Sequence, residues 1–245
     1  MSFSWTRVGA IFHKELRDYR RNRFVLIFTM AFLPLVLVTV PTIQLFTISL
    51  SATNKALDTR VGLSLLYLLV IPAILPATLS AYSVVGEREQ GTLEPVLITP
   101  IRREEFLVGK ALAILLPTLV IAYAMFGIFL AGAALFAHPA VSSAVFERSH
   151  LLVQLLFAPL LAGWSIWVGI AISARASDVR VAQQLGVFAS VPPLAIVALM
   201  SLNVITPSLP VALGLAAALL VVDGFGWRAV SAMFDRERLV TSRHT

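Results

Sequence analysis

Side chains of the kinds that carry out catalysis or bind metals are few in this chain and lie far apart. The absence of cysteine excludes disulfides, thiolate metal sites and cysteine nucleophiles. His138 and His150 share one polar connection, but two histidines without a third ligand do not predict a metal site, and we expect none. Asp223 is the one ionisable side chain well inside an apolar run, which makes it a functional candidate. Arg228 follows little more than one helical turn later, so we expect these two side chains to pair near a membrane surface.

The chain also contains parts of two enzyme motifs, and neither motif is complete. Glu104-Glu105 matches the start of the EExxxR motif of one intramembrane protease family, but Gly109 stands where the arginine is required. Gly109-Lys110 matches part of the P-loop pattern, but Ala111 follows the lysine instead of Ser or Thr, and Glu104 occupies the position of the first glycine. We therefore expect no catalytic site and no cofactor on this chain. Any process powered by ATP would need a second polypeptide.

The polar stretch with the most internal organisation is Gly86–Pro100, which lies between two long apolar runs and reads GEREQGTLEPVLITP. Gly91 is predicted to break the helix that continues from the preceding run through residues 87–89, because glycine is unfavourable inside a helix. Charged residues flank this break on both sides. The stretch is therefore unlike an ordinary solvated loop between membrane spans.

The second half of this stretch predicts a short amphipathic helix. Thr92 is suited to cap the helix, and Pro95 falls in its first turn, where the missing N–H costs little. Leu93, Val96 and Leu97 then lie at positions i, i+3 and i+4, which places them on one face. A short helix with one apolar face and a charged rim favours docking into a groove of a partner protein.

The elements that carry these residues are membrane-spanning helices. Hydrophobic residues make up 58% of the chain and charged residues only 13%, and the apolar runs reach the roughly 20 residues that a helix needs to cross a bilayer. We predict an all-α polytopic membrane protein in which residues 1–245 form one transmembrane domain. The six spans are predicted at about residues 24–50, 61–86, 106–136, 151–174, 181–203 and 209–228. Prolines inside these spans predict kinks.

The net charge of +6 is distributed in a way that indicates membrane topology rather than nucleic-acid binding. Of the 19 Lys and Arg residues, 16 lie before the first span, in the even-numbered connections or after the last span. Only Lys55, Arg60 and Arg148 lie in the alternate connections. Basic residues accumulate on the cytoplasmic side of membrane proteins. This asymmetry therefore places both termini, and a tail at residues 229–245, in the cytoplasm.

The chain begins with a predicted interfacial helix at about residues 3–21. Its apolar face is formed by Trp5, Val8, Phe12, Leu16 and Tyr19. Basic residues gather on the opposite side, which suits a helix lying in the plane of the membrane surface. The pattern is a poor match to a signal peptide, because charges persist to Arg23 and the next apolar run is too long. An ordinary anchor and a moving part of the protein both remain open.

Polar residues elsewhere give further candidates. The second inner connection, at residues 173–184, contains Ser177 as a predicted N-cap for the next helix. Gln44, Gln154 and Asn203 are polar groups at or near membrane depth. Each of them either lines a pathway through the bundle or makes a hydrogen bond between helices, and the sequence leaves both interpretations open.

The stretch EREQGTLEPVLITP, followed by RREEFLVGKALA, resembles the signature of ABC type-2 transporter permeases, the membrane subunits of ABC exporters. In that family this segment joins the second and third spans and serves as the coupling helix to the ATPase. The resemblance implies that the matching positions couple to an ATPase, together with the apolar residues that follow. These positions are Glu87, Arg88, Glu89, Gly91, Thr92, Leu93, Glu94, Val96 and Leu97. It implies a second inner contact at Ser177, Asp178 and Arg180.

The resemblance further implies an exporter permease in the cytoplasmic membrane, with a second permease copy, two ATPase subunits that hold ATP and Mg²⁺, and lipid as partners. We expect no nucleic-acid partner. Pro95 and a brief connection between the fifth and sixth spans depart from the family pattern. Two alternatives remain: a membrane scaffold or sensor that docks a cytoplasmic protein, and a carrier driven by an ion gradient. The lack of buried acids in the spans disfavours the carrier.

Overall fold

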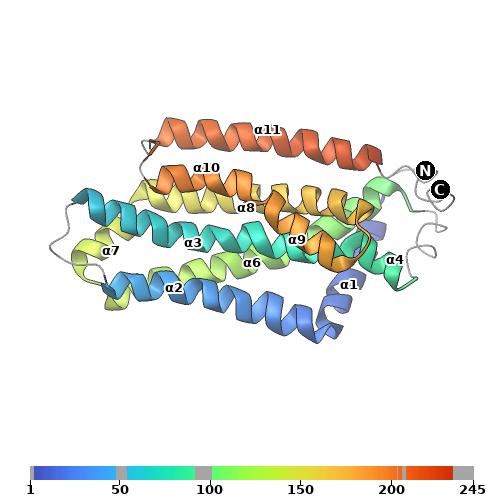
Figure 1. Cartoon of the computed structure of the whole chain (residues 1–245), viewed down its shortest axis with the longest axis horizontal. Helices are drawn as coiled ribbons and strands as arrows, with labels where there is room; N and C mark the ends of the chain where they lie inside the picture. Colours follow the sequence, from blue (N-terminus) through green and yellow to red (C-terminus); the bar gives the residue numbers. More distant parts are fainter. Residues whose placement is uncertain (1–2, 48–53, 92–100, 203, 206–207, 234–245) are drawn as a thin grey trace.

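A computed structural model describes residues 3–47, 54–91, 101–202, 204–205 and 208–233. The described residues form an elongated bundle of helices that run along one axis, without a strand (Figure 1). A shorter helix near the N-terminus crosses one end of the bundle. Six helices are long and apolar enough to cross a membrane, which confirms the predicted fold class and the predicted number of spans.

The helices follow one another in the order that the apolar runs predict. In chain order they are α1 (Trp5–Arg21), the π-helix η1 (Phe24–Phe32), α2 (Leu33–Thr47), α3 (Asn54–Ala81), the π-helix η2 (Tyr82–Gly86), α4 (Glu87–Glu89), α6 (Arg103–Phe136), α7 (Pro139–Val145), α8 (Arg148–Arg175), α9 (Val179–Ala189), α10 (Val191–Ser201) and α11 (Leu209–Met233). The end of the bundle that carries α1 and α4 is called the α1 end below, and the opposite end, which carries α7, the α7 end (Figure 1).

Helix α3 is the centre of the bundle. It contacts α2, α6, α8, α9 and α10, and the candidate span that contains it, Ala56–Glu89, is the most buried of the six. Figure 1 shows α3 between α2 on one side and α8 and α10 on the other. Helix α3 continues through η2 into α4, so one unbroken span runs from the middle of the bundle to the α1 end.

The fifth span is broken in the middle, as its two prolines predict. Helix α9 ends at Ala189 and α10 begins at Val191, just before Pro192 and Pro193. In a continuous helix the Ala189 carbonyl would accept a hydrogen bond from the N–H of residue 193, but proline has no N–H. The indole Nε1 of Trp164 on α8 donates to this carbonyl instead, at 2.8 Å. The break is therefore satisfied by a neighbouring helix, as expected for prolines at membrane depth.

Helix α1 packs on α6 through a face that differs in part from the predicted one. Its buried residues are Val8, Ile11, Glu15 and Tyr19, whereas Trp5 is exposed. Val8 and Tyr19 of the predicted apolar face are thus packed against the protein, whereas Trp5 of the same face is not. Gly109 of α6 allows the close approach, since a Cβ at this position would lie 2.8 Å from the Cβ of Ile11 and 3.1 Å from the Val8 carbonyl oxygen.

Candidate functional site

A buried cluster of charges lies at the α1 end, where α1 crosses α6 and the beginning of α4. The Nζ atom of Lys110 lies 2.9 Å from Oε1 of Glu15 and 3.1 Å from Oε1 of Glu87. Lys14 pairs with the same two carboxylates, and Nζ of Lys110 also lies 4.9 Å from the centre of the Phe106 ring. Three helices that are far apart in the sequence are thus joined by one network of ion pairs. The cluster holds α1 in a fixed position against α6 and α4.

The cluster is stable because each buried charge meets an opposite one. Lys110 is 1% exposed, and Glu15 and Glu87 are each 6% exposed. Burial alone would raise the pKa of Glu15, but Lys110 and Lys14 together lower it below its ordinary value. The pKa of Lys14 is raised in turn, because the attraction of Glu15 and Glu87 outweighs its partial burial. Both shifts favour the ionised forms of Lys14 and Glu15.

A second ionic contact fastens the start of α1 to the start of α6. The fully buried carboxylate of Glu105 accepts hydrogen bonds from Nε and Nη2 of Arg7, at 2.7 and 2.6 Å. It also accepts from the backbone N–H of Ser4, at 2.7 Å, and from that of Arg102, at 3.1 Å. A bidentate guanidinium pair is strong and directional. The orientation of α1 on α6 is thus fixed at two separate places.

A serine of α8, Ser173, inserts its hydroxyl into the backbone hydrogen bonds of the second span at η2. The Oγ atom of Ser173 donates to the Ala81 carbonyl at 2.7 Å and accepts from the N–H groups of Val84 and Val85, both at 3.1 Å. In a regular α-helix, the Val85 N–H would donate to the Ala81 carbonyl directly. The inserted hydroxyl explains why this stretch, η2, is a π-helix. It also connects α8 to the base of α4.

Arg88 and Glu89 join the two connections at the α1 end, which the sequence predicts to be the inner ones, to each other. Nη2 of Arg88 donates to the carbonyls of Ser173 and Ala174 in the last turn of α8, both at 3.3 Å. Oε1 of Glu89 accepts from the Val179 N–H in the first turn of α9, at 3.2 Å. A cation near a helix C-terminus and an anion near a helix N-terminus both complement the helix dipole. The end of the second span is therefore tied to both helices that flank the second inner connection.

The second inner connection differs from the prediction in its cap. Asp178, rather than Ser177, is the N-cap of α9, and its Oδ1 accepts from the Val181 N–H at 2.9 Å. This hydrogen bond lowers the pKa of Asp178. Ser177 donates its hydroxyl to the other carboxylate oxygen of Asp178, at 3.3 Å. Asp is as good a cap as Ser, and Arg180 is exposed in the first turn of the helix.

The predicted break at Gly91 is confirmed. Helix α4 ends at Glu89, and Gly91 has a φ of +68°, a left-handed conformation that suits glycine. The rest of the predicted coupling segment lies outside the described residues, and this part comprises Thr92, Leu93, Glu94, Val96 and Leu97. Arg88 and Glu89 are exposed, whereas Glu87 is buried in the cluster with Lys14 and Lys110.

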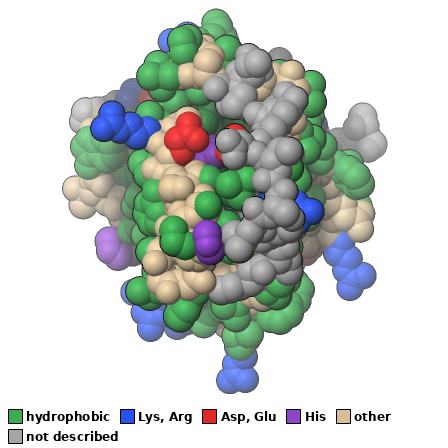
Figure 2. All heavy atoms as spheres, turned by 90° about the vertical axis from the view of Figure 1, so that its left-hand side faces the viewer, with side chains coloured by type: hydrophobic (Ala, Val, Ile, Leu, Met, Phe, Trp, Pro, Cys, Tyr) green, Lys and Arg blue, Asp and Glu red, His purple; other side chains and the backbone are tan. Residues whose placement is uncertain are grey.

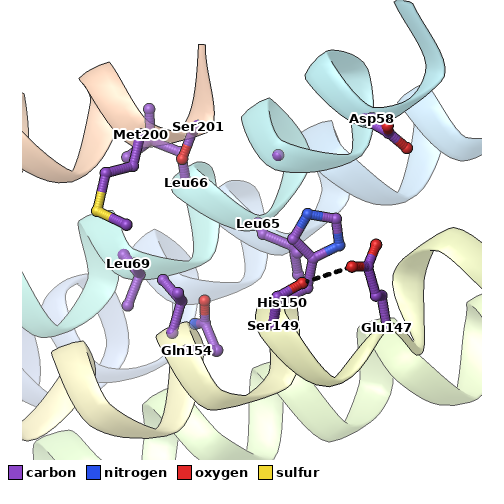
Figure 3. Close-up of a pocket in the computed structure, with 12 residues that line it drawn as sticks. Asp58, Leu65, Leu66, Leu69, Glu147, Ser149, His150, Gln154, Met200 and Ser201 are labelled. Atoms are coloured by element: carbon purple, nitrogen blue, oxygen red, sulfur yellow. Dashed lines mark hydrogen bonds between the residues drawn. The ribbon is translucent and has the colours of Figure 1, made fainter. Parts of the chain in front are cut away.

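The polar residues predicted at membrane depth do not form one group. Gln44 accepts a hydrogen bond from Ser64 at 3.0 Å, which links α2 to α3. Gln154 is buried on α8 and lines a cavity at the α7 end (Figure 3), and Asn203 lies outside the described residues. Asp223 accepts a hydrogen bond at 3.0 Å from Nε1 of Trp167 on α8. Its predicted pairing with Arg228 was wrong.

Sequence reasoning missed the residues that hold the α1 end together. Glu15 could have been found, because it lies four positions from both Ile11 and Tyr19 and so falls on the face that α1 buries. Lys110 is a lysine seven positions into a membrane-length helix, which also marks it as unusual. Ser173 gave no such signal, because a serine near a helix end is common.

The bundle and its charged end define a multi-pass helical membrane protein. In the part of the chain that the structure describes, no group of three or more His, Cys, Asp and Glu side chains could hold a metal ion. The sequence model of the family described as "ABC-2 family transporter protein" matches residues 9–234. The chain therefore belongs to this family of ABC transporter membrane components, which act with an ABC ATPase. Among curated proteins, no significant match to the chain is found.

Proposed function

We propose that this protein is the permease subunit of an ABC exporter in the cytoplasmic membrane, with both termini in the cytoplasm. Two copies, or one copy with a related permease, enclose the pathway, and two separate ATPase subunits bind at the α1 end. ATP and Mg²⁺ are bound by those subunits. The observation that carries the proposal is the joining of both inner connections, through Arg88 and Glu89, into one unit.

This unit suits the transmission of force from a partner. A displacement of residues 87–97 by the ATPase would move α3, because α3, η2 and α4 form one continuous span. The same displacement would be transmitted to α8 and α9 through the hydrogen bonds of Arg88 and Glu89. It reaches α1 and α6 through the ion pairs of Glu87 with Lys14 and Lys110. Movement of the segment is thus transmitted to the bundle as rigid-body motion.

The residues of the coupling segment have different roles in this proposal. Glu87 is buried, so it positions the segment instead of contacting the ATPase. Arg88 and Glu89 join the inner connections, while Leu93, Val96 and Leu97 supply the apolar face that contacts the ATPase. An apolar centre with a charged rim is the usual composition of a protein interface. Ser177, Asp178 and Arg180 flank Val179, whose N–H donates to Glu89, and they form a second, smaller contact with the ATPase.

The test uses variants of the coupling segment in the assembled complex. Leu93→Asp places a charge in the apolar face, and Gly91→Pro removes the left-handed turn, since proline is restricted to negative φ. Both variants are expected to insert normally and to lose both the co-purifying ATPase and transport. Leu93→Met is the matched control, because it keeps an apolar side chain of similar size, and it should retain both properties.

The same experiment distinguishes the alternatives. If Leu93→Asp and Gly91→Pro keep full complex formation and activity, the coupling assignment is wrong. A partner that co-purifies in equal amount but hydrolyses no ATP would support a scaffold or sensor instead. Transport that follows an ion gradient and needs no ATPase would support a carrier.

A further inference from the structure

We propose that the α7 end of the bundle contains a binding site for an amphiphilic organic cation, a molecule with a primary ammonium group and an apolar tail. The ammonium group binds in a polar cavity between α3, α8 and α10. The tail binds in an adjoining apolar cavity between α8, α10 and α11. The site itself stands on the geometry of this chain. Only its use as a substrate site rests on the proposed exporter function.

The polar cavity has a volume of about 130 Å³, and half of its lining residues have side chains with hydrogen-bond acceptors. The carboxylates of Asp58 and Glu147 lie at its exposed edge, and Figure 2 shows acidic and histidine side chains together on this end of the molecule. Nδ1 of His150 lies 2.9 Å from the Ala144 carbonyl and must be its donor. In the tautomer that makes this hydrogen bond, Nε2 is the ring's acceptor. The described lining residues include no Lys or Arg.

Gln154 shows that the cavity is suited to a hydrogen-bond donor. Its side chain is 1% exposed, and its Oε1 has no hydrogen-bond partner among the described residues. A buried acceptor without a partner costs about 1–3 kcal/mol, so such groups are rare in native structures. Gln154 lies one turn beyond His150 on α8, and Figure 3 shows both side chains directed from α8 into the space between α8 and α3. An N–H group of a ligand would satisfy this oxygen.

The arrangement favours an organic cation over a metal ion. The acidic and imidazole groups at this end are not close enough together to form a metal site in the part of the chain that the structure describes. A metal ion needs several ligand atoms at once, each at roughly 2.0–2.6 Å from the ion. An alkylammonium group needs one acceptor at hydrogen-bond distance, and nearby carboxylates stabilise its charge without direct contact.

The adjoining cavity gives the ligand its second chemical feature. It has a volume of about 260 Å³, and half of its lining residues are leucine. It shares Val153, Met200 and Ser149 with the polar cavity. The two cavities together reach the lower part of the range of small-ligand sites, roughly 300–1,000 Å³. Cavities that share three lining residues lie side by side. A ligand with an ammonium head and a short aliphatic tail matches both cavities at once.

The test is equilibrium binding of radiolabelled dodecylammonium to the purified full chain in nanodiscs of zwitterionic lipid, with empty nanodiscs as the blank. Saturable binding above the blank is expected. Dodecanoate, which has a similar tail and the opposite charge, should not compete for the site. Dodecyltrimethylammonium has no N–H group and should compete at least about 10-fold more weakly, as expected for loss of a hydrogen bond to a charged group.

Variants connect the binding to the named residues. Gln154→Leu should weaken dodecylammonium binding about 10-fold or more and should leave thermal stability unchanged or higher, because it removes an unpaired buried acceptor. Asp58→Asn, an exposed substitution, should weaken binding by about 3-fold through loss of a nearby charge. Glu104→Gln removes an exposed acid at the opposite end and should bind as the wild type does.

Four results would each overturn the proposal, and three of them concern the binding of dodecylammonium itself. These are binding no greater than to empty nanodiscs, equal competition by dodecanoate, and unchanged affinity in both Gln154→Leu and Asp58→Asn. Displacement of dodecylammonium by Ca²⁺ or Zn²⁺ at micromolar concentration would overturn it in favour of a metal site. Because binding is measured without an ATPase, its failure leaves the proposed coupling function untouched. Loss of ATPase co-purification would not affect the binding result either.

Discussion

Removal of the Lys110 ammonium group is the sharpest perturbation of the α1 end. Lys110→Met keeps most of the side-chain volume but removes one of the two ammonium groups that pair with the buried carboxylates of Glu15 and Glu87, and the other, that of Lys14, is partly exposed. Removing one partner of a buried ion pair costs about 3–5 kcal/mol. The exposure of Lys14 lets the cluster adjust, so we expect the lower value, about 3 kcal/mol. This cost falls on the docking of α1 and α4 against α6.

The assay is hydrogen exchange of the α1 amides in the purified protein. A loss of about 3 kcal/mol corresponds to exchange that is faster by roughly two orders of magnitude in α1, with little change at the α7 end. The double variant Lys110→Met with Glu87→Gln restores a neutral cluster, and we expect it to recover most of the protection of α1. Unchanged exchange in Lys110→Met would refute the reasoning. Equal exchange in the single and double variants would also refute it.

Three further predictions concern the same end of the bundle. Gly109→Ala should lower thermal stability by about 1–3 kcal/mol, because α1 is in the way of the new Cβ, whereas Gly127→Ala, at an open position, should not. Ser173→Ala should lower the free energy of unfolding by about 2–3 kcal/mol, because it leaves backbone groups of η2 unpaired. Its control, Ser177→Ala, should lower it by less than about 0.5 kcal/mol. Equal melting temperatures for the two glycine variants, or for the two serine variants, would contradict the account. The lowered pKa of Glu15 means that its contribution to stability is present above about pH 4.3 and is lost as the pH falls through the folded-state pKa. The rate of proteolysis of α1 should therefore increase only at acid pH. An equal rate at neutral and at acid pH would contradict the prediction.

The bundle could be predicted from the sequence because each span is a local feature. An apolar run of about 20 residues defines a membrane helix whatever its neighbours are. Gly91, and Pro192 with Pro193, interrupt a helix through the properties of their own backbone. These predictions are confirmed because they need no knowledge of tertiary contacts.

The contacts of the α1 end could not be predicted because they join residues far apart in the chain. Lys110 pairs with Glu15 across 95 positions, and Ser173 binds the Val84 N–H across 89. Pairings of this kind depend on which helices become neighbours, and a single sequence does not specify that. The prediction for Asp223 failed for the same reason. Its sequence neighbour Arg228 was the obvious partner, whereas Trp167 is the partner in space.

The central claim is that an ATPase binds the coupling segment at the α1 end, and single-cysteine crosslinking tests it most directly. The chain has no cysteine, so Val96→Cys creates a unique reactive site. A short bifunctional cysteine-to-lysine reagent, applied to the complex purified in mild detergent, should join Val96→Cys to a chain that hydrolyses ATP. Ser143→Cys, exposed on α7, should give no such product. A crosslink to the ATPase from Ser143→Cys, or the absence of one from Val96→Cys, would contradict the account.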